Sequence, residues 1–233
     1  MLFRSRSSWK NQGTDPGLVA FYPESAVGGI WEDAVDGLAS GALGAGASNQ
    51  IMPDTGFPAI KFNAAANSYV LVQDQAKLRF TANTSSSFTV EAWVYATGNG
   101  SAGTWGGMII NKDSEFEITR RVDGRIAVAI DWGSQQNNPD KDLPGGGWIV
   151  PPEGSCVVPL KVATHVAMVV DADKLRIYIN GVPQVMRVVT GQNNQKINEY
   201  ELTISRYQRD DRNNMLDRKS TRLNSSHIPL SRM

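Results

Sequence analysis

The stretch that decides the fold is residues 164–182, THVAMVVDADKLRIYINGV. Apolar residues stand at every second position in 166–170 and again in 175–179, on either side of a short turn that contains two aspartates. This period of two predicts half-buried antiparallel strands, because successive side chains of a strand point to opposite faces. Asn180 and Gly181 then supply two residues that tolerate positive φ, as a type I′ hairpin turn requires. The stretch predicts an antiparallel sheet and says little about activity.

Short segments of the same kind recur on both sides of this stretch. The segment 87–95, SFTVEAWVY, is partly apolar on both faces and is predicted to be a central strand between two layers. No segment of ten or more residues has the pattern of an amphipathic helix. Many short strands separated by turns predict an all-β sandwich or barrel. Besides 87–95 and 164–182, we expect strands at 18–22, 59–63, 69–73, 108–111, 115–120, 125–131, 155–159, 183–189 and 201–207.

Length and composition exclude several classes of protein. A chain of 233 residues is long enough for one large β domain with its own core. No apolar run approaches the roughly 20 residues of a membrane-spanning helix, and a formal net charge of zero gives no electrostatic reason to expect nucleic acid as a partner. The single cysteine, Cys156, allows no intramolecular disulfide and leaves the cellular compartment open. Residues 1–12 are basic but lack the apolar stretch of a signal peptide.

The last 17 residues, DRKSTRLNSSHIPLSRM, differ from the rest of the chain. Residues 217–227 resemble the in-frame translation of a common sequencing adapter, and residues 231–233 match a later part of the same adapter. We therefore predict that 217–233 is a non-native, disordered tail and that the gene is cut short at its 3′ end. The alternative is a basic tail that binds an acidic partner. Because four of the 23 basic residues and one of the 23 acidic residues lie in this tail, residues 1–216 carry a net charge of −3.

Several segments, taken together and in order, resemble the laminin G-like, concanavalin A-like lectin and glucanase family. They are YVLVQD from Tyr69, SFTVEAWVY from Ser87, MIINKDSEFEI from Met108, DGRIAVAI from Asp123, the stretch 164–182, and ELTISRY from Glu201. The resemblance covers about residues 17–216 and implies a jelly-roll sandwich of two antiparallel sheets; residues 1–16 read as a linker or fragment edge. Members usually have Trp where Ala163 stands, and they close with a strand like G-x-I-D-E-V-R-I. The predicted tail takes the place of that strand, so we expect a sandwich without its last strand.

Acidic residues at alternate positions are the first candidates for catalysis. Glycosidases that resemble this fold carry E-x-D-x-E on one strand, because residues two apart share a face and can flank the scissile bond. The nearest match is Asp113, Glu115 and Glu117, which form D-x-E-x-E in a predicted hairpin. We interpret them as a solvated face beside Lys112 and Arg120. No catalytic residue is therefore predicted, and the chain is not expected to be an enzyme.

Two other reactive side chains have simple structural interpretations. His165 is the one histidine outside the predicted tail, and a lone histidine on a buried strand is usually a core residue whose hydrogen bonds are satisfied. Cys156 is interpreted as a small apolar residue on an edge strand. One histidine and one cysteine give little support to a zinc site or to a Cys-His nucleophile.

The long polar loop 133–147, GSQQNNPDKDLPGGG, is the best candidate for ligand binding. Laminin G-like domains often bind calcium at rim loops, and calcium prefers several carboxylate and carbonyl oxygens. The candidate metal ligands are Asn137, Asn138, Asp140 and Asp142. Sugars are recognised by aromatic faces with neighbouring amides, so the candidate ligand-binding residues are Trp132, Gln135, Asn137, Asn138 and Trp148. The alternatives are that these polar residues only form turns and that the two tryptophans pack into the sandwich.

The sequence as a whole predicts a non-catalytic carbohydrate- or protein-binding β-sandwich module. We expect its partner to be a glycan or a protein surface, without nucleic acid and without a membrane span, and calcium is its candidate cofactor. The expected setting is a larger secreted, cell-surface or virion protein, although no signal peptide is seen. A divergent glycoside hydrolase of the same fold and a structural assembly domain are the alternatives.

Overall fold

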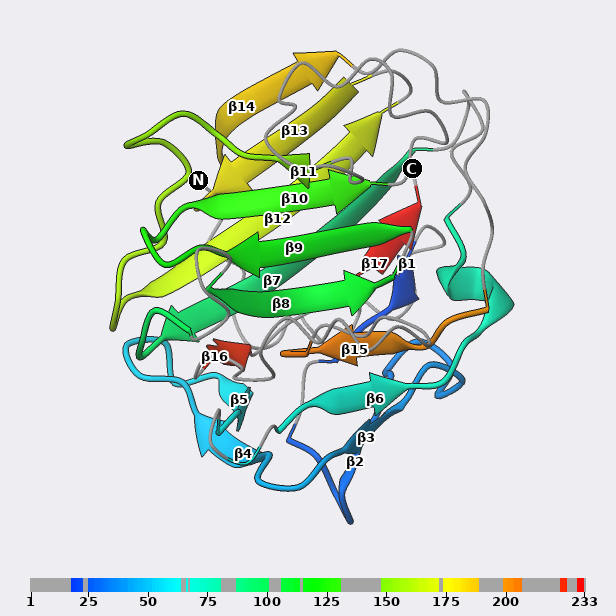
Figure 1. The fold of residues 1–233 in the computed structure, drawn as a ribbon. Helices are drawn as coiled ribbons and strands as arrows, with labels where there is room; N and C mark the ends of the chain where they lie inside the picture. The colour runs from blue at the N-terminus through cyan, green and yellow to red at the C-terminus, as the bar shows by residue number, and fades with distance from the viewer. Residues whose placement is uncertain are drawn as a thin grey trace, which may run out of the picture.

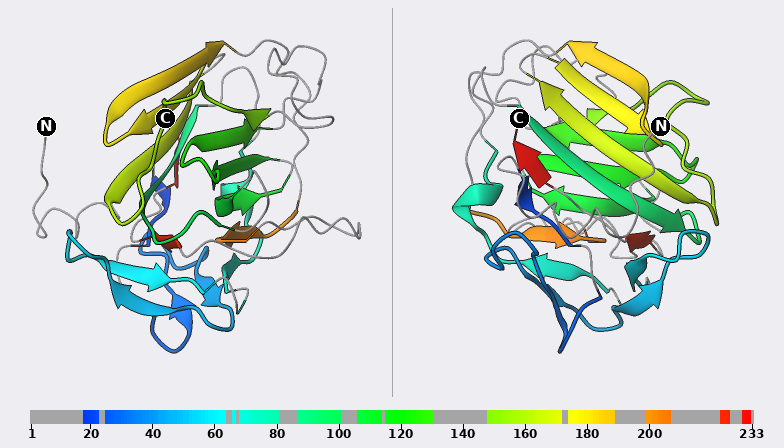
Figure 2. Two further views of the ribbon diagram at one scale, coloured as in Figure 1. Left: turned by 60° about the vertical axis from the view of Figure 1, so that its left-hand side comes forward. Right: turned by 180° about the vertical axis from the view of Figure 1, so that it is seen from behind.

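The computed structural model describes residues 18–22, 25–63, 66, 68–80, 87–100, 106–113, 115–130, 148–171, 174–188, 199–206, 223–225 and 230–232. In this part of the chain two antiparallel β-sheets lie face to face (Figure 1). The turned views in Figure 2 show the same two layers from the side and from behind. The predicted all-β sandwich of two antiparallel sheets is therefore confirmed. Among the described residues, no helix combines the length and the apolar character needed to cross a membrane.

The nine-stranded sheet contains the deciding stretch. Its strand order is β14-β13-β12-β7-β16-β5-β4, and β17 pairs with both β7 and β1. Its strands are β1 (Leu18–Ala20), β4 (Ser48–Ile51), β5 (Pro58–Lys61), β7 (Phe88–Ala96), β12 (Ala163–Asp171), β13 (Lys174–Ile179), β14 (Val182–Val188), β16 (Leu223–Ser225) and β17 (Leu230–Arg232).

The eight-stranded sheet forms the other layer. Its strand order is β11-β10-β9-β8-β15-β6-β3-β2. A short 3₁₀ helix, η3 (Ala76–Leu78), follows β6. The strands of this sheet are β2 (Ile30–Trp31), β3 (Gly41–Leu43), β6 (Val70–Val72), β8 (Gly107–Lys112), β9 (Phe116–Arg120), β10 (Ile126–Ile130), β11 (Trp148–Ile149) and β15 (Leu202–Ile204).

The deciding stretch folds as its pattern predicts. β12 pairs with β13 from Val166↔Ile179 to Asp171↔Lys174. The hairpin between β13 and β14 turns at Asn180 and Gly181, whose φ angles of 51° and 76° are both positive. The Asn180 side-chain oxygen also accepts a hydrogen bond of 2.8 Å from the His165 N–H, which ties the hairpin to β12.

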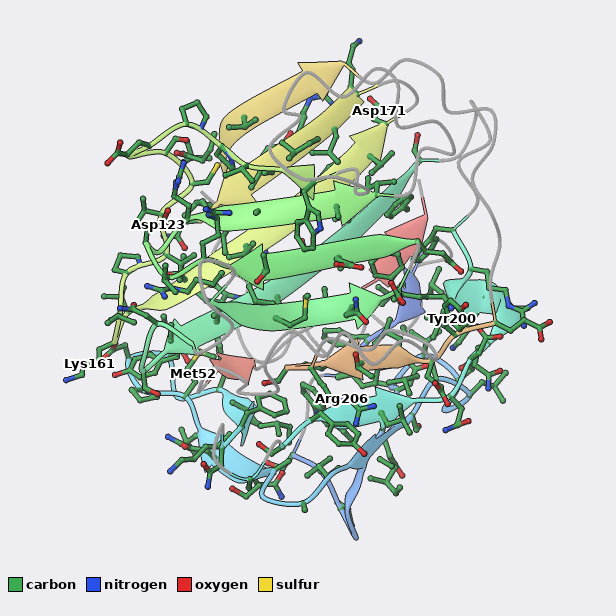
Figure 3. The ribbon with its side chains drawn as sticks, in the orientation of Figure 1. Met52, Asp123, Lys161, Asp171, Tyr200 and Arg206 are labelled. Atoms are coloured by element: carbon green, nitrogen blue, oxygen red, sulfur yellow. The ribbon has the colours of Figure 1, made fainter. Side chains whose placement is uncertain are left out.

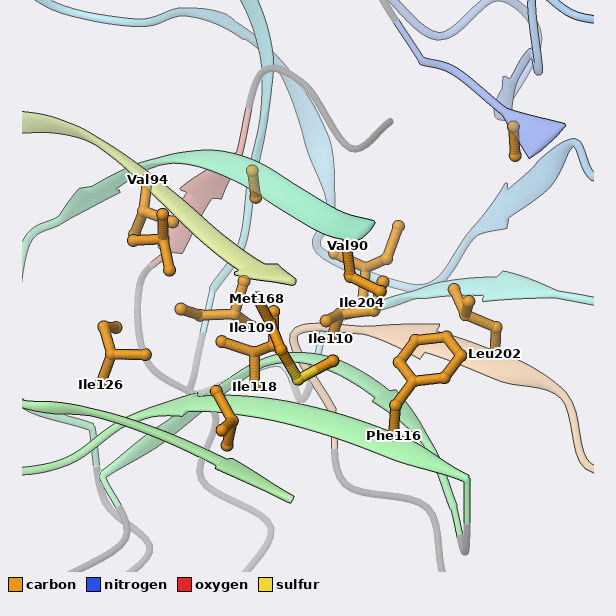
Figure 4. Close-up of a cluster of buried hydrophobic side chains, with 14 of the residues drawn as sticks. Val90, Val94, Ile109, Ile110, Phe116, Ile118, Ile126, Met168, Leu202 and Ile204 are labelled. Atoms are coloured by element: carbon orange, nitrogen blue, oxygen red, sulfur yellow. The ribbon is translucent and has the colours of Figure 1, made fainter. Parts of the chain in front are cut away.

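The core lies between the two sheets and consists of the inward-facing residues of both. Val90, Val94 and Met168 from the nine-stranded sheet meet Ile118 and Phe116 from the eight-stranded sheet (Figure 4). All five side chains are at most 1% exposed. Because burying a large apolar side chain contributes about 1.5–3 kcal/mol, each of these side chains stabilises the fold substantially.

Two local predictions differ from the structure. Residues 155–159 do not form a strand; within them Val157 makes a single bridge to Arg125, and Cys156 is fully buried in the core. The glycine-rich segment 24–49, whose composition predicts a long connection with one short strand, contains β2, β3 and the start of β4. Strands this short carry too few alternating residues to be recognised by their period.

The tail is also more ordered than predicted at two places. Leu223–Ser225 and Leu230–Arg232 form strands that pair with β7, so the expected disorder of 217–233 is wrong for these residues. The edge of β7 offers backbone hydrogen-bonding groups that an extended segment can satisfy, whatever its side chains. The adapter origin of the tail, the domain boundaries and the missing last strand remain predictions.

Candidate functional site

Most of the predicted binding residues lie outside the described part of the chain. This applies to Trp132, Gln135, Asn137, Asn138, Asp140 and Asp142. Trp148 is described and begins β11, the edge strand of the eight-stranded sheet. β11 pairs directly with β10 through Ala129↔Trp148 and Val128↔Ile149. The loop 131–147 therefore leaves and re-enters the sheet at two neighbouring strands.

Trp148 lies on the face of the eight-stranded sheet that points away from the core. Its neighbour Ile149 is 5% exposed and belongs to the core, so the half-buried Trp148 takes the opposite face. The pairing Trp148↔Ala129↔Glu117↔Asn111↔Thr203 runs straight across this outer face through β11, β10, β9, β8 and β15. Strands lie about 4.8 Å apart, so Trp148 and Glu117 are roughly 10 Å apart along this row.

Glu117, Asn111 and Thr203 form what we call the polar row. Their exposed fractions are 7%, 0% and 0%, although they face away from the apolar layer. Thr119 lies on the same face, two residues along β9, and its hydroxyl donates a hydrogen bond of 2.9 Å to the Gly107 carbonyl. Burying polar groups is costly unless they are hydrogen-bonded, and the Thr203 hydroxyl donates a hydrogen bond of 2.7 Å to the Arg206 carbonyl.

Ser205, just beyond β15, adds a strained residue to this face. Its φ is 68°, a value that residues with a side chain rarely adopt, and its N–H donates a hydrogen bond of 3.0 Å to the Ile109 carbonyl. The side chain is fully buried, and its hydroxyl has no hydrogen-bond partner within the described residues. Strained backbone of this kind is often found at functional sites.

An aromatic side chain with a stacked cation borders the same face. The Arg206 guanidinium lies 3.8 Å from the centre of the Tyr69 ring, in a cation–π contact. Figure 3 shows Arg206 and Tyr200 at the two ends of β15. Both Tyr69 and Arg206 are half-buried, so part of each remains accessible beside the polar row.

The acidic residues considered for catalysis do not form a solvated face. Lys112, Asp113, Glu115, Glu117 and Arg120 are all at most 7% exposed, so that interpretation was wrong. The alternation also fails to place the acids together. Glu117 faces outward on β9, whereas Glu115 precedes the strand and accepts a hydrogen bond of 3.1 Å from the Phe80 N–H.

Glu115 belongs instead to a buried ion cluster at the rim of the core. The Lys112 ammonium lies 2.9 Å from Asp74 Oδ1 and 3.4 Å from Glu115 Oε1, and it donates a hydrogen bond of 2.6 Å to the Tyr200 carbonyl. Arg79 completes the cluster by binding Asp74 through two nitrogens. Burial raises the pKa of Asp74, but the hydrogen bonds from Arg79 and Lys112 outweigh it and hold that pKa below its usual value.

His165 lies on the outer face of the other sheet and is not a core residue, contrary to prediction. Its ring centre is 5.4 Å from that of Trp93, and its Nε2 is 3.4 Å from Glu91 Oε2. Phe57 packs edge-on against Trp93 at 6.1 Å. These four half-buried residues form a second aromatic patch, separated from the polar row by the whole core.

No cluster of three or more His, Cys, Asp or Glu side chains in the described residues is arranged to hold a metal. Asp171, the last residue of β12, accepts hydrogen bonds of 3.3 and 3.4 Å from the Ser87 hydroxyl and the Arg176 guanidinium. The predicted calcium ligands fall in the loop outside the described residues, so that site stays a prediction.

The sequence could have indicated part of this face. In MIINK the apolar run ends at Asn111, and in FEITR the polar Glu117 and Thr119 alternate with Phe116 and Ile118, which is the period of a strand with one polar face. It could not show that Thr203 and Trp148, distant in sequence, continue the same row.

The comparisons with known proteins agree with this architecture. The binding domain of Paraclostridial Mosquitocidal Protein 1 superposes with a TM-score of 0.68 at 14% identity, covering 94% of this chain and 49% of that one. Botulinum neurotoxin type C, whose cell entry depends upon interaction with two ganglioside molecules, gives a TM-score of 0.59 at 11% identity, covering 97% of this chain and 49% of that one. Trypanosoma rangeli sialidase gives 0.59 at 14% identity, covering 92% and 30%.

These similarities establish the fold alone, and the chain spans about half or less of each of these proteins. A search of curated protein sequences finds no match. The family profile described as "Concanavalin A-like lectin/glucanases superfamily" matches residues 64–217, about two thirds of the chain. The chain therefore belongs to the concanavalin A-like lectin/glucanases superfamily, as its strand pattern implied.

Proposed function

We propose that this chain is a non-catalytic glycan-binding module. Its site is the outer face of the eight-stranded sheet, at the end where the loop 131–147 leaves and re-enters. Trp148 stacks on the apolar face of a sugar ring, and the side chains of Gln135, Asn137 and Asn138 in this loop supply the amide groups that bind hydroxyls. The observation that carries the proposal is the position of Trp148, half-buried on the outer face of the edge strand that directly follows the polar loop.

The similar structures support a glycan as ligand. One is the binding domain of a mosquitocidal protein, one is a neurotoxin that interacts with gangliosides, and a third is a sialidase. The setting we propose is a larger secreted or surface protein, in which this module holds a glycan while other domains act.

The arrangement of the acids favours binding over hydrolysis. A retaining glycosidase needs two carboxyl groups about 5–5.5 Å apart on opposite sides of the scissile bond. Glu117 faces outward, but Glu115 is held at the rim of the core by Lys112 and by the Phe80 N–H. Glu115 and Glu117, which the sequence spacing suggested as a pair, therefore face different surroundings and do not form one site.

A glycan array followed by titration tests the proposal. The wild-type chain is first screened on an array that includes neutral and ganglioside-type oligosaccharides, and the best binder is titrated by calorimetry. We expect Trp148→Leu to weaken binding at least tenfold and the matched control Trp93→Leu, on the other sheet, to change it less than twofold. An empty array with folded protein would contradict the function, and loss of binding in Trp93→Leu alone would move the site to the other sheet.

Calcium is a further part of this proposal. The loop oxygens of Asn137, Asn138, Asp140 and Asp142 are of the type that calcium prefers, and a bound ion would fix the loop beside Trp148. We expect millimolar calcium to raise the midpoint of thermal unfolding and Asp140→Asn/Asp142→Asn to abolish that shift. An equal shift with magnesium, or one that persists in the double variant, would contradict a site in this loop.

A further inference from the structure

The second aromatic patch, formed by Phe57, Glu91, Trp93 and His165, lies on the other sheet from the proposed glycan site. All four residues are half-buried, so part of each is accessible to a ligand. His165 of β12 stands opposite Trp93 of β7, and Glu91 is two residues along β7 on the same face. The view from behind in Figure 2 shows β7, β12 and β13 side by side on this side of the molecule. Three of the four residues are therefore positioned by paired central strands.

Aromatic rings form the body of this patch. The Trp93 ring centre is 6.1 Å from that of Phe57 and 5.4 Å from that of His165. The face of an indole ring attracts cations more strongly than the rings of tyrosine and phenylalanine do. The centre of the patch therefore offers an electron-rich, largely apolar surface.

Glu91 adds a carboxylate beside these rings without a permanent cation next to it. Its side chain is 34% exposed, and its ion pair within the described residues is with His165, at 3.4 Å between Oε2 and Nε2. A histidine carries a positive charge only when it is protonated. Arg176, on β13, pairs with Asp171 instead, at 3.4 Å. In the described part of the chain, no lysine or arginine therefore balances the charge of Glu91 through an ion pair.

Tyr178 adds an aromatic ring on the far side of this carboxylate. Ala167 of β12 stands opposite Glu91 of β7 and also opposite Tyr178 of β13, so the three residues form a row on the outer face. Neighbouring strands lie about 4.8 Å apart, which places the backbones of Glu91 and Tyr178 roughly 10 Å from each other. Only the methyl group of Ala167 stands between them. A ligand at Glu91 therefore meets Trp93 along the strand and Tyr178 across the sheet.

The chemistry of this face favours a quaternary ammonium ion as ligand. A carboxylate among aromatic rings complements a positive charge, and quaternary ammonium groups are recognised by aromatic cages. Such a group has no N–H, so it needs no hydrogen-bond acceptors, and its methyl groups bury apolar surface against the rings. A primary ammonium, by contrast, carries three N–H donors that lose their water and require acceptors.

We propose that the second aromatic patch, together with Tyr178, binds a quaternary ammonium group such as that of choline. Glu91 supplies the opposite charge, and Trp93 and Tyr178 supply the aromatic faces. The same group occurs in free choline and in the headgroup of phosphatidylcholine, and the patch recognises the part that they share. Because the core separates this patch from Trp148, a glycan and a quaternary ammonium group bind the chain independently.

An NMR titration of the ¹⁵N-labelled full chain with choline chloride, at constant ionic strength, tests the site. We expect a saturable shift of the Trp93 indole signal, which is assigned by its absence in Trp93→Leu. The control ligand is the uncharged isostere of choline in which carbon replaces the nitrogen, and we expect it to bind roughly tenfold more weakly or not at all. Equal binding of the isostere, or a Trp93 signal that never moves with choline, would overturn the proposal.

Variants separate the contribution of the charge from that of the ring. Glu91→Gln keeps the shape and removes the charge, and we expect it to weaken choline binding roughly fivefold or more. The matched control Glu153→Gln, at an exposed carboxylate outside the patch, should change it less than about twofold. Trp93→Phe keeps a weaker aromatic face, so its affinity should fall between those of wild type and Trp93→Leu. Unchanged binding in Glu91→Gln, or equal weakening by both glutamine variants, would contradict the proposal.

Vesicles distinguish the two sources of the ligand. The chain is sedimented with vesicles of phosphatidylcholine and, as a control without quaternary ammonium, of phosphatidylglycerol. Sedimentation with phosphatidylcholine alone, lost in Glu91→Gln, assigns the site to the lipid headgroup. Choline binding without sedimentation assigns it to a free small molecule. Equal sedimentation with both lipids that persists in Glu91→Gln would show that the membrane is bound by other means and would count against a quaternary ammonium site.

Discussion

At the scale of single residues, burial determines how reactive the Cys156 thiol is. Cys156 is fully buried, and this burial raises the pKa of its thiol to about 11. The thiolate is the reactive form, so at pH 8 very little of it exists in the folded chain. We expect a disulfide reagent such as DTNB to leave Cys156 unmodified at pH 8 until denaturant unfolds the protein. Rapid stoichiometric reaction of the native chain would show that Cys156 is accessible.

The protonation of Asp74 makes the stability supplied by the buried ion cluster depend on pH. Its pKa in the folded state is held below its unfolded value, so its contribution to stability is present at neutral pH and is lost as the pH falls from about 4 through the folded pKa. Asp74→Asn leaves the buried Lys112 without this carboxylate, and we expect a loss of about 2–3 kcal/mol at pH 7. Urea unfolding at pH 7 and pH 3 checks this, because the difference between wild type and variant should shrink at the lower pH. A difference that is equal at both pH values would contradict the role given to Asp74.

At the scale of elements, the hairpin between β13 and β14 shows how one turn controls the sheet. Gly181 has a φ of 76°, where an added Cβ is strained even though no heavy atom lies within 4 Å of it. We expect Gly181→Ala to destabilise the chain by about 1 kcal/mol, whereas the same change at Gly98, whose φ is not positive, serves as the matched control. Chemical denaturation measures both variants, and an equal cost at the two glycines would argue against a type I′ turn.

The sequence predicted the elements in proportion to their length. β7, β12 and β13 carry several alternations each, and their limits differ from prediction by one residue or so. β2 and β11 have two residues each, and no periodicity exists in two residues. The polar row was missed for a related reason: Thr203 and Asn111 become neighbours only through the pairing of β15 with β8, which joins segments about 90 residues apart.

At the scale of the whole molecule, the sandwich depends on how the edge of β7 is covered. Removing residues 217–233 would leave this edge without β16 and β17, exposing backbone hydrogen-bonding groups next to the core. We expect residues 1–216, expressed alone, to be poorly soluble and to elute as aggregates in size-exclusion chromatography. A monodisperse sample that melts cooperatively would show that the sandwich does not need this cover.

The fold class was predictable because burial imposes a period on every long strand, whereas the binding face that we propose stays a prediction. Trp148 was predicted from its place beside a polar loop, and the structure puts it on the same face as Glu117 and Asn111. The interpretation of Lys112 and Glu115 as solvated residues was wrong. Their partners Asp74 and Arg79 lie near β6 and η3, about 40 residues earlier in the chain, so the sequence did not show that the charges pair in a buried cluster.

The most direct test of the central claim measures glycan binding and glycan hydrolysis in the same NMR sample. The chain is labelled with ¹⁵N, and the Trp148 indole signal is assigned by its absence in Trp148→Leu. The best glycan from the array is then added while its own proton signals are recorded for a day. Glycan binding without catalysis predicts a saturable shift of the Trp148 signal and an unchanged glycan. New reducing-end signals that disappear in Glu117→Gln, or a Trp148 signal that never moves, would contradict it.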